Sequence, residues 1–361
     1  MTQADIALVS LRKSFGATQV VHGLDLEIPQ GEFVSILGPS GCGKTTTLNM
    51  IAGFEQPTSG QIMIRGKAQN GVPPEKRGIG LVFQNYALFP HMTVEENVAF
   101  GLKMQGKPKA ELAPTVARAL KRVHLEQYGS RYPKELSGGQ QQRTALARAI
   151  APGPSVLLLD EPLSNLDLKL REAMRIELKA LQRELGMTFV YVTHDQDEAM
   201  AMSDRIVVMN RGHIAQQGAP NDIYATPTDS FVADFIGKSN LLEIAGLTPV
   251  EGGTRVALAG GALELLAAPG AVAGAPRFCC IRPESVEMRL PGSPALHAGE
   301  NELGGRITTI VHLGAFLDCW ITLEQGVVLK SLIRSARIPG LAEGQQVQIT
   351  IRKDALRLLA E

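Results

Sequence analysis

The sequence lacks any long apolar run. None of its 361 residues lies in a stretch approaching the about 18 uninterrupted apolar residues that a membrane-spanning helix needs. Its first ten residues, MTQADIALVS, have neither a basic start nor a long apolar segment, so they do not resemble a secretion signal. We therefore expect a protein that stays in the cytoplasm and does not span a bilayer.

An excess of charge of one sign is also missing. Lys plus Arg and Asp plus Glu number 36 each, so no basic field exists to attract nucleic acid or an anionic membrane. We expect no nucleic-acid partner, and any membrane contact must be local. Apolar residues at 44% and charged residues at 20% suit folded globular domains and argue against long disordered tails.

Cysteine is scarce. The four cysteines, Cys42, Cys279, Cys280 and Cys319, show none of the paired spacing that is typical of a zinc site. Cys279 and Cys280 are adjacent, and a buried strand with reduced thiols is favoured over redox chemistry.

The length suits about two domains of roughly 150 residues each. From residue 6 to about 235, strand-like runs at 33–37, 156–159 and 188–192 alternate with helical patterns, which predicts a mainly parallel sheet flanked by helices. The clearest helix has one apolar stripe that ends at Gly186 and for which core packing is expected. Its members are Leu166, Leu170, Met174, Leu178, Leu181 and Leu185.

Two further changes of pattern complete the expected architecture. Between Gln84 and about Ser155 the pattern becomes helical, which predicts a helical subdomain, about 85–155, inserted into the α/β core. Beyond residue 240 short β-type runs appear, separated by Gly/Pro/Ala-rich segments such as 260–275. We expect an α/β domain over 1–238 and a small all-β, barrel-like domain over 239–361. The β-type runs are 278–281, 306–311, 316–323 and 347–351.

The segment GPSGCGKT at 38–45 matches the phosphate-loop pattern G-x-x-x-x-G-K-[ST] and lies between a strand-like run and a helical run at 45–52. Its glycines let successive N–H groups curl around the β-phosphate, and the helix N-terminus adds a positive dipole. Lys44 is expected to reach the β/γ-phosphates and Thr45 to ligate Mg²⁺. Alone, the motif indicates a triphosphatase of unknown kind. The expected nucleotide contacts here are Gly38, Ser40, Gly41, Cys42, Gly43, Lys44, Thr45 and Thr46.

Two carboxylates, Asp160 and Glu161, end the apolar run at 156–159, as parallel strands do when their carboxyl ends form a ligand site. Asp160 is placed to hold Mg²⁺, directly or through water, and Glu161 to polarise the attacking water. A strand that ends in solvated acids is the alternative. The phosphate loop needs such partners, which favours the catalytic interpretation.

A second anion site is indicated by LSGGQ at 136–140, which precedes a helical pattern at 141–150. Ser137, Gly138, Gly139 and Gln140 would then lie at a helix N-terminus. A simple helix cap would explain Ser137 but not two exposed glycines. One chain would therefore have two phosphate sites.

In this order the motifs resemble the ABC ATPase family, and the resemblance covers essentially the whole chain. Residues 136–140 have the family's LSGGQ signature, and Asn-Leu-Asp at 165–167 resembles its D-loop, although Asn165 replaces the Ala of many relatives. Gln84 is similar to the Q-loop glutamine and His194 to the switch histidine. Phe15 resembles the aromatic that stacks on adenine, where relatives often have Tyr or Trp, and a core position is the alternative for it.

The resemblance implies that the nucleotide is ATP. It implies catalytic roles for Glu161, His194, Gln84 and Lys44, and a Mg²⁺ site made by Thr45, Gln84 and Asp160. A lone histidine is usually structural, but His194 follows an apolar strand at the ligand-binding edge of the sheet, where it can hydrogen-bond the γ-phosphate.

A head-to-tail homodimer is also implied, in which Ser137 to Gln140 of one protomer close over ATP held by Lys44 of the other. This arrangement accounts for the two anion sites in one chain. Hydrolysis then depends on closure, so that ATP binding closes the dimer and hydrolysis reopens it.

Residues 86–97, YALFPHMTVEEN, resemble the segment by which importer ATPases grip a coupling helix of their membrane subunits. An exposed aromatic and apolar patch would suit such a groove, while subdomain core is the alternative for half of these residues. Residues 217–227 and 231–237 resemble the closing stretch of importer ATPases that have an appended β-barrel domain. Arg282 and Glu284 match its Arg-Pro-Glu element, and a structural ion pair and ligand binding are equally open for them.

We therefore expect the ATP-hydrolysing subunit of an ABC importer, peripheral on the cytoplasmic face of the inner (plasma) membrane. Its expected partners are a second copy, integral membrane permease subunits and, indirectly, a periplasmic or extracellular solute-binding protein. The sequences of residues 85–104 and of Phe-Ile-Gly-x-x-Asn at 235–240 look closest to those of ATPases in the polyamine, opine and phosphonate uptake branch. The expected cargo is a polyamine or a phosphonate such as 2-aminoethylphosphonate, with ferric iron and sugar as alternatives because other subunits select the solute.

Three rival functions are less consistent with the residues. A cytosolic ABC ATPase acting on ribosomes or DNA is disfavoured by the single ATPase domain, the neutral charge and the lack of a coiled-coil insertion. An exporter subunit usually lacks the β tail. A nucleotide-binding module without catalysis is disfavoured because Glu161 and His194 are both present.

Overall fold

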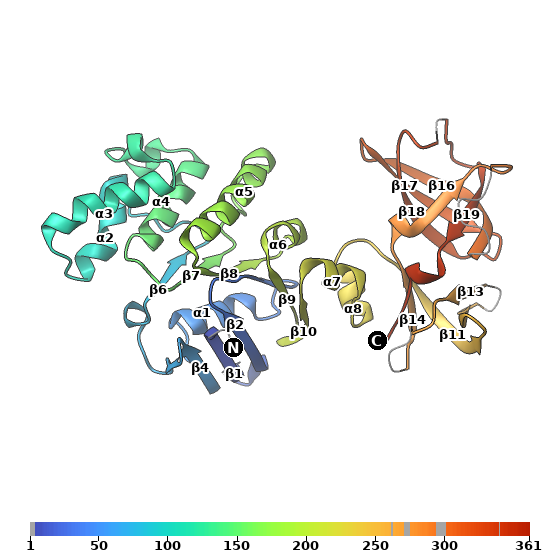
Figure 1. Ribbon diagram of the computed structural model, residues 1–361, viewed down its shortest axis with the longest axis horizontal. Helices are drawn as coiled ribbons and strands as arrows, with labels where there is room; N and C mark the ends of the chain where they lie inside the picture. The colour runs from blue at the N-terminus through green and yellow to red at the C-terminus, as the bar shows by residue number, and fades with distance from the viewer. Residues whose placement is uncertain (1–3, 261–262, 271–274, 294–300, 339) are drawn as a thin grey trace. The chain divides into compact units, whose positions relative to one another are not determined.

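A computed structural model describes residues 4–260, 263–270, 275–293, 301–338 and 340–361 (Figure 1). The chain divides into two compact units, Met1–Asn221 and Asp222–Glu361. This division falls within α7 (Pro220–Ala225), ahead of α8 (Ser230–Phe235). The domain boundary expected at 238/239 lies further along the chain and stays a prediction.

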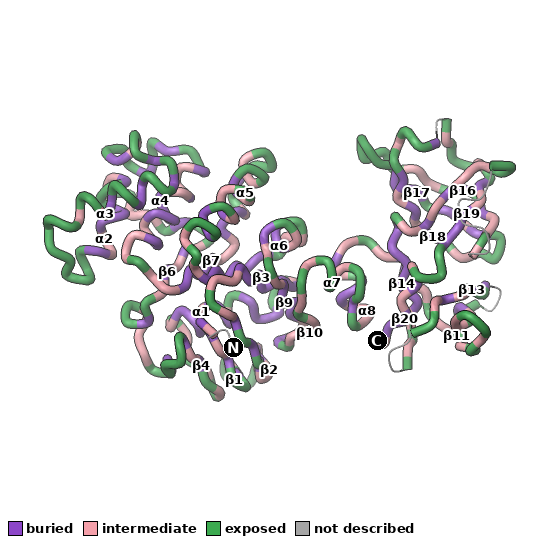
Figure 2. The backbone as a smooth tube through the Cα atoms, viewed as in Figure 1, coloured by how far each residue is buried: buried purple, intermediate pink, exposed green. Residues whose placement is uncertain are grey.

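The first unit contains a six-stranded sheet in the order β10-β9-β3-β8-β7-β6. All neighbours pair in parallel except the edge strand β10. β3 and β8 are buried along their whole length and nearly continuously apolar, as is typical of parallel strands covered on both faces (Figure 2). The predicted parallel sheet is confirmed. Its strands are β3 (Phe33–Leu37), β6 (Ile79–Val82), β7 (Val156–Asp160), β8 (Thr188–Thr193), β9 (Arg205–Asn210) and β10 (His213–Gly218).

A second, antiparallel sheet in this unit was not predicted. Its order is β2-β1-β4-β5, and its apolar face shares one core with the central sheet and with helix α1 (Lys44–Ala52). Ile6, Leu8 and Leu26 of the strands belong to this core, together with Leu48 and Ile51 of α1. The strands are β1 (Ala4–Phe15), β2 (Thr18–Pro29), β4 (Ser59–Ile64) and β5 (Lys67–Ala68).

The expected helical insert is present between β6 and β7. It contains α2 (Val94–Met104), α3 (Lys109–Arg122) and α4 (Gly138–Ile150), whose apolar faces share a core with α5 (Leu168–Leu185). α5 ends at Gly186, as predicted, because this glycine adopts the left-handed conformation with φ 60°. Leu166, predicted as the first residue of the helical stripe, instead precedes the N-cap Asp167 and lies in the loop. Helix α6 (Gln196–Met202) follows β8.

The second unit is all-β apart from α8 and short helical turns. Two five-stranded antiparallel sheets, β13-β12-β11-β14-β20 and β15-β19-β16-β17-β18, share one apolar core. The four predicted strands are present, and β16 is longer than predicted. The Gly/Pro/Ala-rich segment at 260–275 contains β13, and its residues 261–262 and 271–274 lie outside the described residues. The strands are β11 (Asn240–Val250), β12 (Gly253–Leu258), β13 (Glu264–Ala267), β14 (Phe278–Ile281), β15 (Val286–Arg289), β16 (Asn301–His312), β17 (Phe316–Leu323), β18 (Val328–Arg334), β19 (Gln346–Ile351) and β20 (Leu356–Leu359).

All four cysteines are buried free thiols. Cys279 and Cys280 lie on β14, as the sequence predicted. Burial raises the pKa of Cys279 to about 12 and that of Cys319 to about 11, so both stay protonated at neutral pH.

Arg282 ties the segment before β11 to the sheets of the second unit. Its buried guanidinium donates hydrogen bonds to the carbonyl oxygens of Ala233 and Ile236 at 2.9 and 2.7 Å and to that of Tyr224 at 2.8 Å. The guanidinium also lies 4.1 Å from the centre of the Tyr224 ring, whose hydroxyl donates to Glu284. No ion pair joins Arg282 to Glu284 among the residues that the structure describes. Of the two alternatives left open for Arg282, a structural role is present, but it consists of hydrogen bonds to main-chain carbonyls and not of an ion pair with Glu284.

Replacing this arginine by alanine should destabilise the second unit. Arg282→Ala leaves several buried carbonyls without donors, and we expect a loss on the order of 3 kcal/mol in the free energy of unfolding. Denaturant titration followed by the fluorescence of Trp320, the single tryptophan, would report on this unit alone. Arg255→Ala is the control, because Arg255 forms an exposed pair with Glu264, and it should change stability by less than about 1 kcal/mol. Equal effects of the two variants would contradict the assigned role.

Candidate functional site

The segment 38–45 connects β3 to α1 with a main chain that few residues other than glycine permit. Gly41 and Gly43 have φ of 80° and 102°, and a Cβ at Gly38 would overlap the carbonyl oxygen of Met209. No side chain caps α1, so its first N–H groups are available to an anion. The Lys44 ammonium is buried beside them and donates to the carbonyl oxygens of Gly38 and Pro39 at 2.8 and 3.1 Å. This donor set fits a polyphosphate.

The other residues expected to contact nucleotide differ in exposure. Ser40, Gly41 and Thr45 are exposed and Thr46 is half-buried. Cys42 is buried, and burial raises the pKa of its thiol. The Cys42 side chain is thus not exposed to a ligand, and its main-chain N–H donates to the carbonyl oxygen of Pro39 at 3.3 Å.

Asp160 and Thr45 face each other at the end of β7. The Thr45 hydroxyl donates to the Asp160 carboxylate at 3.4 Å. Burial raises the pKa of Asp160, and the neighbouring charge of Glu161 raises it further, while the Thr45 hydrogen bond and the charge of Lys44 offset part of this shift. A carboxylate and a hydroxyl beside a phosphate loop are oxygen ligands of the kind that Mg²⁺ prefers, and a divalent cation would compensate the buried charge.

Glu161 adopts a strained left-handed conformation, with φ 44°. Its N–H donates to the carbonyl of Val192 at 3.0 Å, and its own carbonyl accepts from the Ser164 hydroxyl at 2.9 Å. These bonds hold the side chain so that Oε2 lies 3.1 Å from His194 Nδ1 and 3.4 Å from Gln84 Nε2. Three of the predicted catalytic side chains are thus brought together from the ends of three adjacent strands. Among the described residues, no hydrogen bond joins Gln84 to Thr45 or Asp160.

The D-loop, residues 165–167, is hydrogen-bonded to the segment that contains Gln84 and, through Arg171, to Asp195. The Asn165 amide donates to the carbonyl of Gln84 at 2.9 Å. Arg171 donates to the carbonyl of Leu166 at 3.1 Å and pairs with Asp195 at 3.4 Å. Asn165, where many relatives have Ala, thereby anchors the segment that contains Gln84.

A buried network behind His194 was missed by sequence reasoning. Glu198 accepts hydrogen bonds from the hydroxyls of Tyr191 and Thr193 at 2.6 and 2.7 Å, and Arg175 pairs with Asp195 at 3.2 Å. Asp195 and Glu198 stand at the N-cap and third positions of α6, which is a helix-start pattern and the one available signal in the sequence. The network fixes the residues on both sides of His194.

The predicted signature segment begins α4. Ser137 forms a capping box with Gln140, with reciprocal hydrogen bonds of 2.9 and 3.4 Å. Gly138 is exposed as expected, but Gly139 is buried, so the prediction of two exposed glycines is wrong for Gly139. A Cβ at Gly139 would lie 3.1 Å from the Leu170 side chain, which explains this glycine by packing. In the described part of the chain, no hydrogen bond or ion pair joins 137–140 to 38–46.

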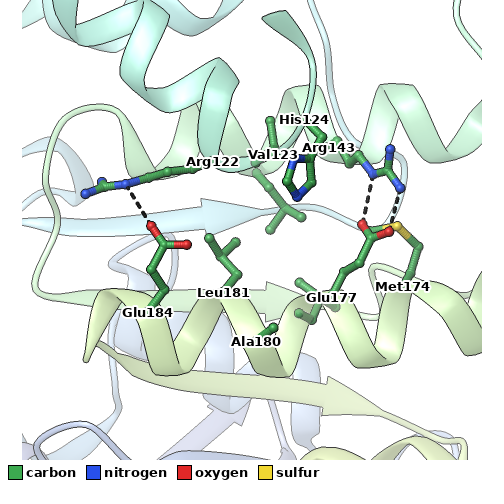
Figure 3. A pocket seen from close by; sticks show the side chains of 11 residues that line it. Arg122, Val123, His124, Arg143, Met174, Glu177, Ala180, Leu181 and Glu184 are labelled. Carbon is green, nitrogen blue, oxygen red and sulfur yellow. Dashed lines mark hydrogen bonds and ion pairs between the residues drawn. The ribbon is translucent and has the colours of Figure 1, made fainter.

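Two ion pairs hold the helical insert against α5. Arg143 of α4 makes a bidentate pair with Glu177, at 2.7 and 3.0 Å, and Arg122 at the end of α3 pairs with Glu184 at 3.5 Å. Figure 3 shows these pairs on either side of a small cavity of about 130 Å³, with Leu181 on its wall. The orientation of α4, and with it the signature segment, is therefore set partly by α5.

Phe15 lies at the end of β1 and is 47% exposed. Its ring is 4.7 Å from the Lys13 ammonium, a cation–π contact. The alternative that Phe15 is a core residue is excluded, and one exposed aromatic ring is available near the start of the nucleotide-binding unit.

Comparison with known proteins shows the family. Residues 21–164 match the ABC transporter family, and residues 279–359 match the TOBE domain. The chain is 51% identical to the spermidine/putrescine import ATP-binding protein PotA of Thermobifida fusca, over 86% of this chain and 81% of that protein. It is 44% identical to the protein of the same name from Nitrosospira multiformis, over 97% and 98% of the two chains. The chain belongs to the ABC transporter family of ATP-binding proteins.

Solved ABC proteins have the same fold in the nucleotide-binding unit. The cbiO1 protein of Clostridium perfringens, part of an ABC transporter complex, is 31% identical with a TM-score of 0.57 over 62% of this chain and 92% of its own. A dimeric bacterial ABC transporter cassette is 35% identical with a TM-score of 0.54 over 60% and 98% of the two chains. The expected fold is confirmed, and this ABC protein is an ATPase coupled to transport. None of the helices described is long and apolar enough to cross a membrane.

Removing the buried charge of Asp160 should separate stability from activity. The raised pKa means that ionised Asp160 destabilises the nucleotide-free fold at neutral pH, so Asp160→Asn should raise the melting temperature of the nucleotide-free protein. This gain should shrink as the pH falls through the folded-state pKa, because Asp160 is then protonated. The same variant should lose the thermal stabilisation that Mg²⁺ adds to ATP. Thermal unfolding at several pH values, with ATP in EDTA or in Mg²⁺, measures both, and an unchanged Mg²⁺ effect would contradict the site.

Proposed function

We propose that this ABC protein hydrolyses ATP to energise the import of a polyamine such as spermidine or putrescine. Relatives carrying that name align over nearly the whole chain, including the C-terminal unit. The protein of that name in Pseudomonas aeruginosa, PotA 2, is 47% identical over 99% of both chains. These full-length matches favour a polyamine over the phosphonate, ferric iron and sugar alternatives.

The catalytic proposal rests on one observation, the position of Glu161 between His194 and Gln84. Glu161 would orient the attacking water and accept its proton, because its carboxylate lies beyond the end of β7 and is 20% exposed. His194 would hydrogen-bond the γ-phosphate, and Gln84 would orient the water from the other side. Mg²⁺, when bound, would neutralise phosphate charge. A contact between Gln84 and the metal would require its side chain to turn from Glu161.

Substrate binding is assigned to the residues of the phosphate loop. Gly38 to Thr46 would hold the phosphates with Lys44 as the cation, while Thr45 and Asp160 would ligate Mg²⁺. Phe15 would stack on adenine from its exposed position. The signature residues Ser137 to Gln140, at the start of α4, would contact the nucleotide of a second copy. A similar solved ABC transporter cassette is dimeric, which supports a homodimer with two shared sites.

The proposed contact with permease subunits is the docking loop, residues 86–92, with the start of α2. Ala87, Pro90 and His91 are exposed, whereas Tyr86 is buried, in keeping with the expected mixture of surface and core. Phe54, which is 56% exposed and makes a tilted ring contact with Phe83 at 5.9 Å, adds apolar surface in the same unit. Such contacts would place the protein on the cytoplasmic face of the membrane, with a solute-binding protein acting through the permease.

Glu161→Gln should bind ATP normally and hydrolyse it at least about 100-fold more slowly, because the amide cannot accept the proton of water. ATP would then accumulate in a closed dimer, measured by size-exclusion chromatography with light scattering. Lys44→Ala is the matched comparison and should weaken ATP binding itself. Turnover at the wild-type rate in Glu161→Gln would exclude this residue as the base.

Deletion of the gene should lower uptake of radiolabelled spermidine and putrescine, and wild-type protein but not Glu161→Gln should restore it. Uptake of 2-aminoethylphosphonate, ferric iron and maltose by the same cells provides the comparison. Loss of one of these with normal polyamine uptake would reassign the cargo, and normal uptake of all four would refute an importer for these solutes.

A further inference from the structure

Two consecutive residues of the docking loop adopt the left-handed conformation that side chains disfavour. Tyr86 has φ 61° and Ala87 has φ 44°, and neither is glycine. Each such residue costs roughly 1–2 kcal/mol, so the turn persists only where the surroundings hold it.

Arg148 supplies that restraint from the C-terminal end of the signature helix α4. Its two terminal nitrogens donate to the carbonyl oxygens of Ala87 and Tyr86 at 2.6 and 2.7 Å. The guanidinium also lies 5.5 Å from the centre of the Phe89 ring. Among the described residues it pairs with no carboxylate, and burial lowers its pKa. A partly buried cation is thus committed to the two carbonyls of the strained turn.

The other end of the docking loop is bonded to α2. Buried Asn97 accepts from the N–H of Phe89 at 2.9 Å and donates to the carbonyls of Phe89, Met92 and Thr93 at 2.9 to 3.1 Å. With Arg148 on one side and Asn97 on the other, the loop has little freedom to move independently of α4 and α2. Its position therefore follows these helices.

α4 spans the distance from the signature segment to this turn. Arg148 lies eleven positions after Ser137 in the chain, which corresponds to about 16 Å along a helix. The capping box stabilises its first turn and the Arg143 pair with Glu177 holds its middle. Displacement of the signature end is therefore transmitted to the guanidinium.

We propose that Arg148 is a positioning residue that couples closure of the signature segment over ATP to the position of the docking loop. The inference rests on the proposed function for the use of that loop, but not on the identity of the cargo. The bidentate geometry of the Arg148 guanidinium is the essential feature, because a lysine in its place would retain the charge but could not hold both carbonyls in the same way.

The first test measures amide hydrogen exchange in residues 86–92 of the Glu161→Gln protein with and without ATP. ATP should change exchange in this segment when Arg148 is present, and Arg148→Lys should reduce that change at least about fivefold with ATP affinity kept within about twofold. Arg118→Lys is the control, since Arg118 is an exposed arginine of the neighbouring helix α3 that donates to Thr115, and the ATP-dependent change should persist. An undiminished change in Arg148→Lys would overturn the proposal.

A second variant separates positioning from simple relief of strain. Ala87→Gly removes the conformational penalty, so in the Arg148→Lys background it should restore the melting temperature without restoring the ATP-dependent exchange. Recovery of both would show that Arg148 only stabilises the turn and would overturn the proposal.

The last measurement uses the reconstituted transporter with spermidine-loaded binding protein. Spermidine-stimulated ATPase activity should fall at least about fivefold in Arg148→Lys, while the activity of the isolated subunit stays within about twofold of wild type. If the wild-type complex shows no stimulation, the polyamine function fails and the exchange result stands. If Arg148→Lys is stimulated as strongly as wild type, the coupling role fails and the function stands.

Discussion

The parallel pairing of β3, β6, β7 and β8 is the constraint on which the site depends. Parallel strands end at the same edge of a sheet, so the segments that follow these four strands meet there. Lys44, Gln84, Glu161 and His194 belong to those four segments. Residues 150 positions apart in the chain thereby contribute to one site, and the remaining hydrogen bonds adjust their side chains.

The site contains several unfavourable features that the surrounding structure stabilises. Glu161 has a left-handed main chain, Asp160 is a buried carboxylate and Lys44 is a buried ammonium. Hydrogen bonds from the Glu161 N–H to Val192 and from the Ser164 hydroxyl to Glu161 hold Glu161, and the network around Glu198 holds the loop of His194. Strain and buried charge of this kind are common where a protein must bind a charged ligand, because the ligand relieves them.

The site residues that could be predicted from the sequence are those whose role depends on the local main-chain conformation. A phosphate loop needs glycine, a catalytic carboxylate follows a buried strand, and a capped helix begins with Ser137, so local patterns identify all three. The clamps formed by Arg148, Arg282 and Asn165 could not be predicted, because each joins a side chain to carbonyl groups far away in the chain. Gly139 shows a related limit, since a side chain there would press against Leu170 on another helix, which the local sequence does not reveal.

A site shared between two copies requires a rigid connection inside each copy. In the proposed dimer, contact of Ser137 with the nucleotide of the second copy would release free energy at the start of α4, whereas a permease would be contacted at residues 86–92. A flexible connection would use up that free energy in ordering its own main chain, because fixing the backbone of each residue costs about 1–2 kcal/mol. A single helix, capped at one end and hydrogen-bonded to the docking loop at the other, limits this loss. The backbone strain at Tyr86 and Ala87 is then explained by the need to direct two carbonyl oxygens toward one guanidinium.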